Sequence, residues 1–371
     1  MNPGIRCVAL VLLGLAVGGF LVAASGIVPI KASSGHWAIT RWLLEFGMER
    51  SISTHSLGVE VPRLDDPALI LKGAGHYEIG CRSCHGAPGA LLPRIAQAMT
   101  PAPPELGPRV KESTPKKLFQ VVKHGLKFTG MPAWPSQHRD DEVWAMVAFL
   151  LELPKLDAAS YENLVKGNAT VSNPAETINL TPPVPEIPSS TAQMCARCHG
   201  REGEGRGDGA FPRLAGQRRD YLLNTLSAYA RGARHSGIME PVAAGLTEEL
   251  IRDLSGHYAT LPPRSRERAA PANSELWERG RRIAEEGLPK KRVPSCIECH
   301  GPKGTRTKPA YPSLTGLSAD YLLLQLELFK NEQRGGTANA HLMQEVVAGL
   351  EPEDMRAVAQ YFESLPPDFE P

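Results

Sequence analysis

The 371-residue sequence lacks an excess of charge of either sign, because 41 Lys and Arg residues stand against 40 Asp and Glu residues. A near-neutral chain gives no reason to expect nucleic acid as a partner. No Ser-His-Asp set, phosphate-binding loop or dinucleotide fingerprint stands out, so the enzyme classes that use them are not indicated. Alternation of apolar and polar residues is also scarce, which favours a wholly helical fold.

Outside one recurring motif the only cysteine is Cys7, so a disulfide framework is not indicated. The other six form three Cys-x-x-Cys-His motifs: Cys81, Cys84 and His85; Cys195, Cys198 and His199; Cys296, Cys299 and His300. Two cysteines at this spacing can form thioethers to the vinyl groups of one haem, with the histidine as an axial ligand of the iron. A zinc half-site or a redox-active pair does not need that histidine. The sequence therefore predicts three covalently bound haem c groups.

The second axial ligand decides what each haem does, because a haem with one open face binds small ligands and a haem with two protein ligands carries electrons. A methionine follows each motif histidine at a similar distance: Met131 after 46 residues, Met239 after 40 and Met343 after 43. We therefore expect His/Met ligation, in which the sulfur raises the reduction potential. Nearby histidines leave bis-histidine ligation open, namely His124, His138, His235 and His341. Further candidates, as donors to the haem propionates, are Trp134, Arg213 and Arg218.

The 24 residues between Arg6 and Lys31 carry no charge. Such a run can cross a hydrocarbon core of about 30 Å as a helix. Small residues at Val22-Ala23-Ala24 offer a signal-peptide cleavage site, but the apolar run continues past them, which favours an uncleaved membrane anchor over residues 1–31. A connector, 32–65, is predicted to contain an amphipathic helix that lies either at the membrane interface or on the segment after it.

Composition divides the remainder into three haem-bearing segments, called here the first block (66–155), the second block (191–262) and the third block (272–367). Residues 156–190 are rich in Asn, Thr and Pro and predict an extended linker. The second and third blocks repeat one another, since Phe211-Pro212-x-Leu214-x-Gly216 matches Tyr311-Pro312-x-Leu314-x-Gly316.

Each block ends in a segment whose apolar residues recur at three- and four-residue steps, which predicts a closing helix. These segments begin near Asp140, Thr247 and Pro352, and Asp66-Pro67 is a good start for a helix that opens the first block. A block of this size buries little apolar surface, which limits the stability of its fold. A covalent haem adds a large apolar group around which short helices can pack. The predicted fold is all-α: three tandem small cytochrome c domains, each wrapped round a haem, after an N-terminal transmembrane helix.

With these motifs the chain resembles the class I c-type cytochromes, in which Cys-x-x-Cys-His lies near the start of a domain and the methionine ligand precedes its last helix. The second and third blocks resemble tandem dihaem cytochromes of the c-four type, through the Pro-x-Leu-x-Gly match and the Asp-Tyr-Leu segments at Asp220 and Asp320. The first block resembles a single-haem domain through its loop Gly130-Met131-Pro132. The usual soluble dihaem form lacks this block and the anchor, so the resemblance does not identify the partners.

The resemblance implies a membrane-anchored trihaem carrier of single electrons, with no substrate turnover of its own. Its haem domains would lie on the periplasmic side of a bacterial inner membrane, because the resemblance implies that the haems are attached in the periplasm. The implied partners are redox proteins such as a cytochrome bc complex, a terminal oxidase or a dehydrogenase. The alternative is the cytochrome c subunit of a periplasmic dehydrogenase complex. An enzyme such as a haem peroxidase would need one five-coordinate iron, against which the three methionines argue.

Overall fold

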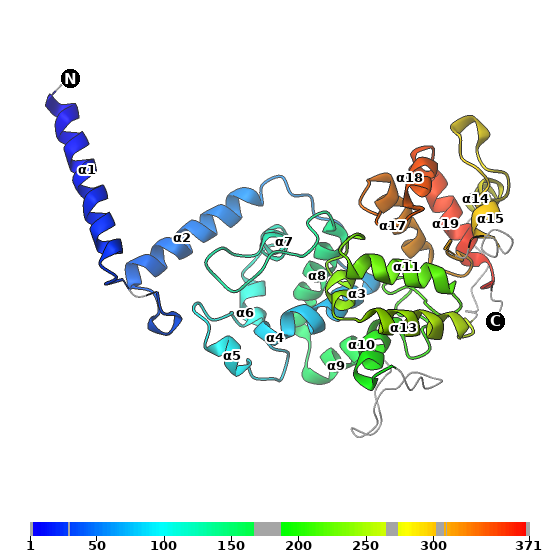
Figure 1. Cartoon of the computed structure of the whole chain (residues 1–371), viewed down its shortest axis with the longest axis horizontal. Coiled ribbons are helices and arrows are strands. Elements are labelled where there is room, and N and C mark those ends of the chain that lie inside the picture. Colours follow the sequence, from blue (N-terminus) through cyan, green and yellow to red (C-terminus); the bar gives the residue numbers. More distant parts are fainter. Residues whose placement is uncertain are drawn as a thin grey trace.

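The computed structural model describes residues 3–28, 30–166, 187–264, 274–301, 308 and 310–368. Within these ranges the chain is helical, and its only β-type pairing is three isolated bridges. The predicted all-α class is confirmed. Figure 1 shows an elongated molecule in which α1 and α2 lie at one end and the helices of the third block lie at the other.

The N-terminal apolar segment forms α1 (Pro3–Ala24), which is exposed along its whole length. Its 22 residues extend for about 33 Å at the usual rise per residue. It is the one helix in the described ranges that is long and apolar enough to cross a membrane, a test that a signal sequence also passes. The helix ends two residues before Gly26, whose positive φ turns the chain, so it is shorter than the uncharged run.

The predicted connector helix is α2 (Ala38–His55). Its Trp42 and Phe46 stack on each other at 5.7 Å between ring centroids and are exposed to solvent. Its Glu49 pairs with Arg109 of the first block at 2.6 Å. The helix therefore contacts the first block, which is one of the two placements predicted for it, and leaves the rings of Trp42 and Phe46 uncovered. Placement at a membrane interface stays a prediction.

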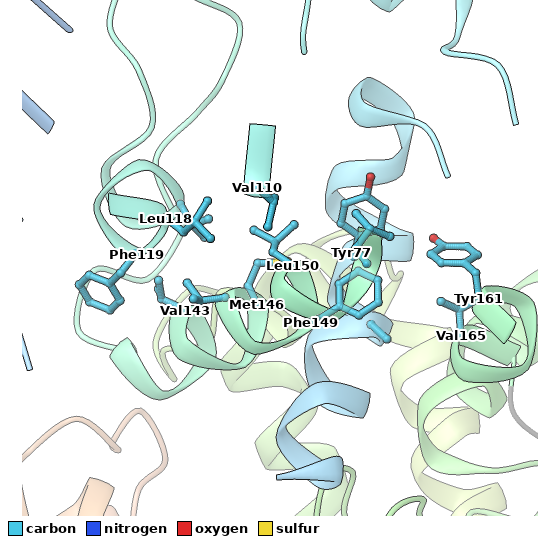
Figure 2. Packing of buried hydrophobic residues seen from close by; sticks show 14 residues of the cluster. Tyr77, Val110, Leu118, Phe119, Val143, Met146, Phe149, Leu150, Tyr161 and Val165 are labelled. Carbon is cyan, nitrogen blue, oxygen red and sulfur yellow. The ribbon is translucent and has the colours of Figure 1, made fainter. Parts of the chain in front are cut away.

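The first block is built on the packing of α3 (Pro67–His76) against α8 (Asp140–Glu152). Asp66 caps α3 as predicted, because its carboxylate accepts from Ala68 N at 2.9 Å. The short helices α6 (Leu106–Lys111) and α7 (Pro115–His124) cover the same core. The buried side chains shown in Figure 2 include Tyr77, Val110, Leu118, Phe119, Val143, Met146, Phe149 and Leu150.

Helix α9 (Ala158–Lys166) also belongs to this core. Tyr161 and Val165 are fully buried, and the Tyr161 ring meets Tyr77 edge-on at 6.2 Å (Figure 2). Because apolar residues four apart share one helical face, this segment packs on the first block. The predicted linker 156–190 is therefore wrong for these residues. Its stretch 167–186 lies outside the described residues.

The second and third blocks have matching elements. The second block contains α10 (Ser189–His199), α11 (Arg219–Ala230), α12 (Met239–Ala244) and α13 (Glu248–Thr260); the third contains α14 (Ser274–Glu286), α15 (Cys296–His300), α17 (Ala319–Lys330), α18 (Ala340–Ala348) and α19 (Pro352–Ser364). Gly216 N donates to Tyr258 O at 3.1 Å, and Gly316 N donates to Phe362 O at 2.8 Å. The repeat in sequence thus corresponds to the same loop-to-helix contact in both blocks.

Glycine lets the opening and closing helices of the first and third blocks approach closely. A Cβ on Gly73 of α3 would lie 2.0 Å from Ala145 O of α8. A Cβ on Gly280 of α14 would lie 2.1 Å from Ala357 O of α19. The first and third blocks therefore each contain the same kind of close contact between their opening and closing helices.

We expect Gly73→Ala to destabilise the protein by about 2 kcal/mol, because the added methyl group must push α8 away. Gly107→Ala in α6 is the matched control, since a Cβ there meets nothing within 4 Å. Urea unfolding followed by circular dichroism measures both variants. Equal stability of the two would contradict the close contact.

His76, at the end of α3, is a buried neutral group. Its Nε2 has no hydrogen-bond partner, and its ring centroid lies 5.7 Å from that of Trp134. Burial, helped by the charges of Lys72 and Arg139, holds the pKa of His76 well below 6.5. Below pH 6.5 His76 becomes protonated in the unfolded chain but stays neutral in the folded chain. The free energy of unfolding therefore falls as the pH falls.

Between pH 6.5 and pH 5 we expect the wild-type chain to lose about 2 kcal/mol more stability than His76→Gln, which has no proton to take up at this position. Urea unfolding of both chains at the two pH values gives the difference. A pH dependence that is the same in both would show that His76 does not contribute.

Candidate haem sites

The three Cys-x-x-Cys-His motifs all lie in short helical segments. The first spans a π-helical turn (Tyr77–Cys81) and α4 (Arg82–His85), the second ends α10 and the third forms α15. Residues three apart share one face of a helix, so the two cysteines of a motif lie side by side with the histidine next to them. A glycine follows each histidine and ends the helix.

Each motif histidine has its Nδ1 against the main-chain carbonyl of a proline further along the chain. His85 Nδ1 lies 3.3 Å from Pro104 O, and the two other pairs, His199 with Pro212 and His300 with Pro312, are each 2.9 Å apart. Because a carbonyl only accepts, Nδ1 carries the proton and Nε2 keeps its lone pair. A contact of this kind fixes the ring of a metal-ligating histidine and raises its basicity.

Burial sets the protonation of these side chains. It lowers the pKa of all three motif histidines, so the rings stay neutral, which is the form that coordinates a metal. It raises the pKa of the thiol to about 12 in Cys81 and Cys296 and to about 11 in Cys195 and Cys198. A redox-active cysteine pair needs a lowered thiol pKa, so the motifs do not suit that chemistry.

The residues fit a haem c better than a metal ion alone. In the part of the chain that the structure describes, no three His, Cys, Asp or Glu side chains gather into a group that could hold a metal ion. The six motif thiols are free and can form thioethers. Beside each pair stands a neutral imidazole whose Nε2 can bind iron.

The predicted methionine ligands are all half-buried. Met131 lies in the loop before α8, Met239 begins α12 and Met343 lies in α18. Met343 packs on the hydrophobic core of the third block, as Cys296 does. Met131 and Met239 lie outside the hydrophobic cores of the first and second blocks. The alternative histidine ligands are all exposed: His124, His138, His235 and His341. Burial therefore favours sulfur over a second imidazole.

Two of the predicted propionate donors contact protein groups instead. Trp134 Nε1, the only donor of that side chain, donates to Glu142 at 3.2 Å. Arg213 donates to Ala215 O at 2.7 Å and to Thr315 O at 2.9 Å. The third candidate, Arg218, is half-buried at the start of α11. The arginine contact to Thr315 joins the second block to the third.

The first and second motifs lie close together in the centre of the molecule, near α3, α9 and α10 (Figure 1). Glu78 pairs with Arg82 of the first motif at 2.6 Å and lies 3.9 Å from Arg197 of the second. A Cβ on Gly75 of α3 would lie 3.5 Å from the Sγ of Cys198. Cys198, the second cysteine of the second motif, therefore lies against the helix that leads into the first motif.

The second and third motifs meet through the loops that hold their histidines. Gln217 donates to Ser313 O at 2.7 Å and accepts from Ser313 N at 3.1 Å. Ser313 directly follows Pro312, just as Arg213 directly follows Pro212. The two proline loops thus face each other across the interface, and the second motif has a neighbour on both sides.

The sequence reasoning missed the proline acceptors and Glu78. Pro212 and Pro312 lie inside the repeated segment, so their matched positions were a signal that could have identified them. Pro104 lies in a proline-rich run with no such match. Nothing in the sequence around Glu78 indicates its contact with Arg197, which comes from a different block.

Two family models match the chain: one described as cytochrome c oxidase, cbb3-type, subunit III, over residues 68–150, and one described as cytochrome c, over residues 277–366. The thiosulfate dehydrogenase electron acceptor of Stutzerimonas stutzeri (strain A1501) is 34% identical over 175 residues, which are 47% of this chain and 80% of that protein. Cytochrome c4 of Thiocapsa roseopersicina is 32% identical over 174 residues, which are 46% of this chain and 87% of that protein.

A crystal structure of reduced cytochrome c4 from Pseudomonas stutzeri is 25% identical and covers 47% of this chain and 95% of that chain, with a TM-score of 0.42. The matched families and relatives agree with the motifs and with the wholly helical fold of the described residues. The chain therefore belongs to the class I c-type cytochromes and contains domains of the dihaem cytochrome c4 kind.

Proposed function

We propose that this chain is a trihaem electron carrier with three cytochrome c domains, anchored by α1 and placed on the periplasmic side of a bacterial inner membrane. The observation that carries the proposal is the threefold recurrence of a Cys-x-x-Cys-His motif whose histidine is at least half-buried, neutral and bound through Nδ1 to a proline carbonyl. Each haem supplies an iron that takes up and releases one electron. The protein supplies the ligands, the burial and the spacing.

In this proposal each haem is held by two thioethers and by two axial ligands, a histidine and a methionine. The attachment residues are Cys81 and Cys84, Cys195 and Cys198, and Cys296 and Cys299; the axial pairs are His85 with Met131, His199 with Met239, and His300 with Met343. With both faces of the iron occupied, no position is left for a substrate, so the role is electron transfer without catalysis.

The contacts between blocks support a relay in which the second haem is the middle one. Its attachment cysteine Cys198 lies against α3 of the first block. On its other side, the loop that holds His199 faces the loop that holds His300, through Gln217 and Ser313. An electron that enters at either end would therefore pass through the second block.

The donor is proposed to be a periplasmic dehydrogenase, because two relatives of this chain are named electron acceptors of thiosulfate dehydrogenase. Acceptors of the class of a cytochrome bc complex or a terminal oxidase would then complete the path. The second candidate function, a stable cytochrome c subunit of a dehydrogenase complex, rests on the same relatives. Co-purification of a catalytic subunit with this chain would favour the second candidate.

We expect three haem c groups per chain, because three motifs share the same geometry. The pyridine haemochrome spectrum of the purified protein, divided by its protein concentration, measures the number. Cys299→Ala combined with Cys296→Ala should lower the count to two, whereas Cys7→Ala, which changes the cysteine outside the motifs, should leave it at three. A count of two in the unaltered chain would contradict the proposal.

We expect Met131→Ala, Met239→Ala and Met343→Ala each to remove about one third of the far-red absorbance band that marks a sulfur–Fe(III) bond. Each should also lower the reduction potential of one haem, because a nitrogen or water ligand stabilises Fe(III) relative to sulfur. Visible spectra and a redox titration give both quantities. Replacement of the exposed His341 by Ala is the control and should leave both the band and the potential of the third haem unchanged. An undiminished band in Met343→Ala, together with a changed potential of the third haem in His341→Ala, would favour bis-histidine ligation of that haem.

A further inference from the structure

Glu142 of α8 is a buried carboxylate whose partners belong to two blocks; it is 1% exposed. From its own block it accepts from Trp134 Nε1 at 3.2 Å and pairs with Arg139 at 2.9 Å. From the second block it accepts from Ser236 Oγ at 2.7 Å and from Gly237 N at 2.6 Å. Since a buried carboxylate is costly to leave without partners, these contacts fix how the two blocks meet.

Ser236 transmits this contact to Met239. Its Oγ donates to Glu142 and accepts from Met239 N at 3.1 Å and from Ile238 N at 3.3 Å. Its own main-chain N–H donates to Glu240 at 2.6 Å. The hydroxyl therefore holds the main chain at the first residue of α12, and a carboxylate of the neighbouring block sets the direction of that hydroxyl.

Two more side chains of the first block hold the same loop. Arg139 Nη1 donates to His235 O at 2.9 Å. The Trp134 ring packs so closely on Gly237 that a Cβ there would lie 2.1 Å from its Nε1. The residues directly before Met239 are thus contacted by three side chains that all come from the first block.

The first block has a comparable contact that stays within one block. Thr129 Oγ1 accepts from Met131 N at 3.1 Å and donates to Leu126 O at 2.7 Å. In both blocks a hydroxyl therefore holds the main-chain N–H of the predicted methionine ligand. Only in the second block does that hydroxyl depend on a residue from another block.

We propose that Glu142 is a positioning residue for Met239, acting through Ser236, so that contact with the first block adjusts the sulfur ligand of the second haem. The inference rests on the proposed function, in which Met239 is an axial ligand. A displaced sulfur binds iron more weakly and lowers the reduction potential. The first block then has two effects on the middle haem: it exchanges electrons with that haem and it sets the potential at which the exchange occurs.

The test uses the full-length haem-loaded protein in detergent. Proton NMR of the reduced protein reports the methyl group of each iron-bound methionine, and the three Met→Ala variants assign the signals. We expect Ser236→Ala and Glu142→Gln to shift or remove the Met239 signal and to lower the potential of that haem alone, leaving the Met131 and Met343 signals in place. Ser236→Thr, which keeps the hydroxyl, should restore both quantities.

Ser318→Ala is the matched control, because Ser318 Oγ also joins two blocks, donating to Asp208 O at 3.1 Å, and contacts no predicted ligand. An unchanged Met239 signal in Ser236→Ala would overturn the positioning role while the proposed function stands. The same shift in Ser318→Ala would also overturn it, since any loss of an interblock contact would then suffice. If Met239→Ala removes no signal, the ligand assignment fails, and the inference fails with it.

Discussion

The proposed chemistry depends on a hydrogen bond from the Nδ1 of the motif histidine to a proline carbonyl, formed at all three motifs. It leaves Nε2 as the only nitrogen that can bind iron and fixes the plane of the ring. The loop that carries the proline must therefore return to the motif helix. In the second and third blocks these same loops form the interface, since Arg213 and Ser313 directly follow the two prolines and contact the opposite block.

The interfaces between the blocks are polar as well as buried. Glu142, Arg139 and Arg213 are each less than a tenth exposed, and each contacts a neighbouring block. Groups of this kind stabilise an interface only when every partner is in place, so they permit few alternative arrangements. Electron transfer between haems depends on their separation and orientation. An interface of this type therefore suits a relay better than an apolar surface on which the blocks could slide.

The order of the blocks along the chain also agrees with the proposed anchor. Helix α2 follows α1 and is held to the first block by the pair between Glu49 and Arg109. Helix α2, which carries the exposed Trp42 and Phe46, lies at the end of the molecule that carries α1, and the third block lies at the far end (Figure 1). In the proposed orientation, the first block would stand beside the membrane and the third would extend toward soluble partners.

The sequence by itself determined the helical class, the three Cys-x-x-Cys-His motifs and the starts of several helices, because these depend on local spacing. Examples are Asp66 before Pro67, Thr247 before its helix, and cysteines three residues apart. It misplaced α9 as linker, because Tyr161 and Val165 are too few to stand out until the core they fill is known. Only the tertiary structure decided which groups contact the motif histidines and the predicted methionine ligands. The contact of Glu142 with Ser236 joins residues of different blocks, and no local pattern in either segment specifies the other.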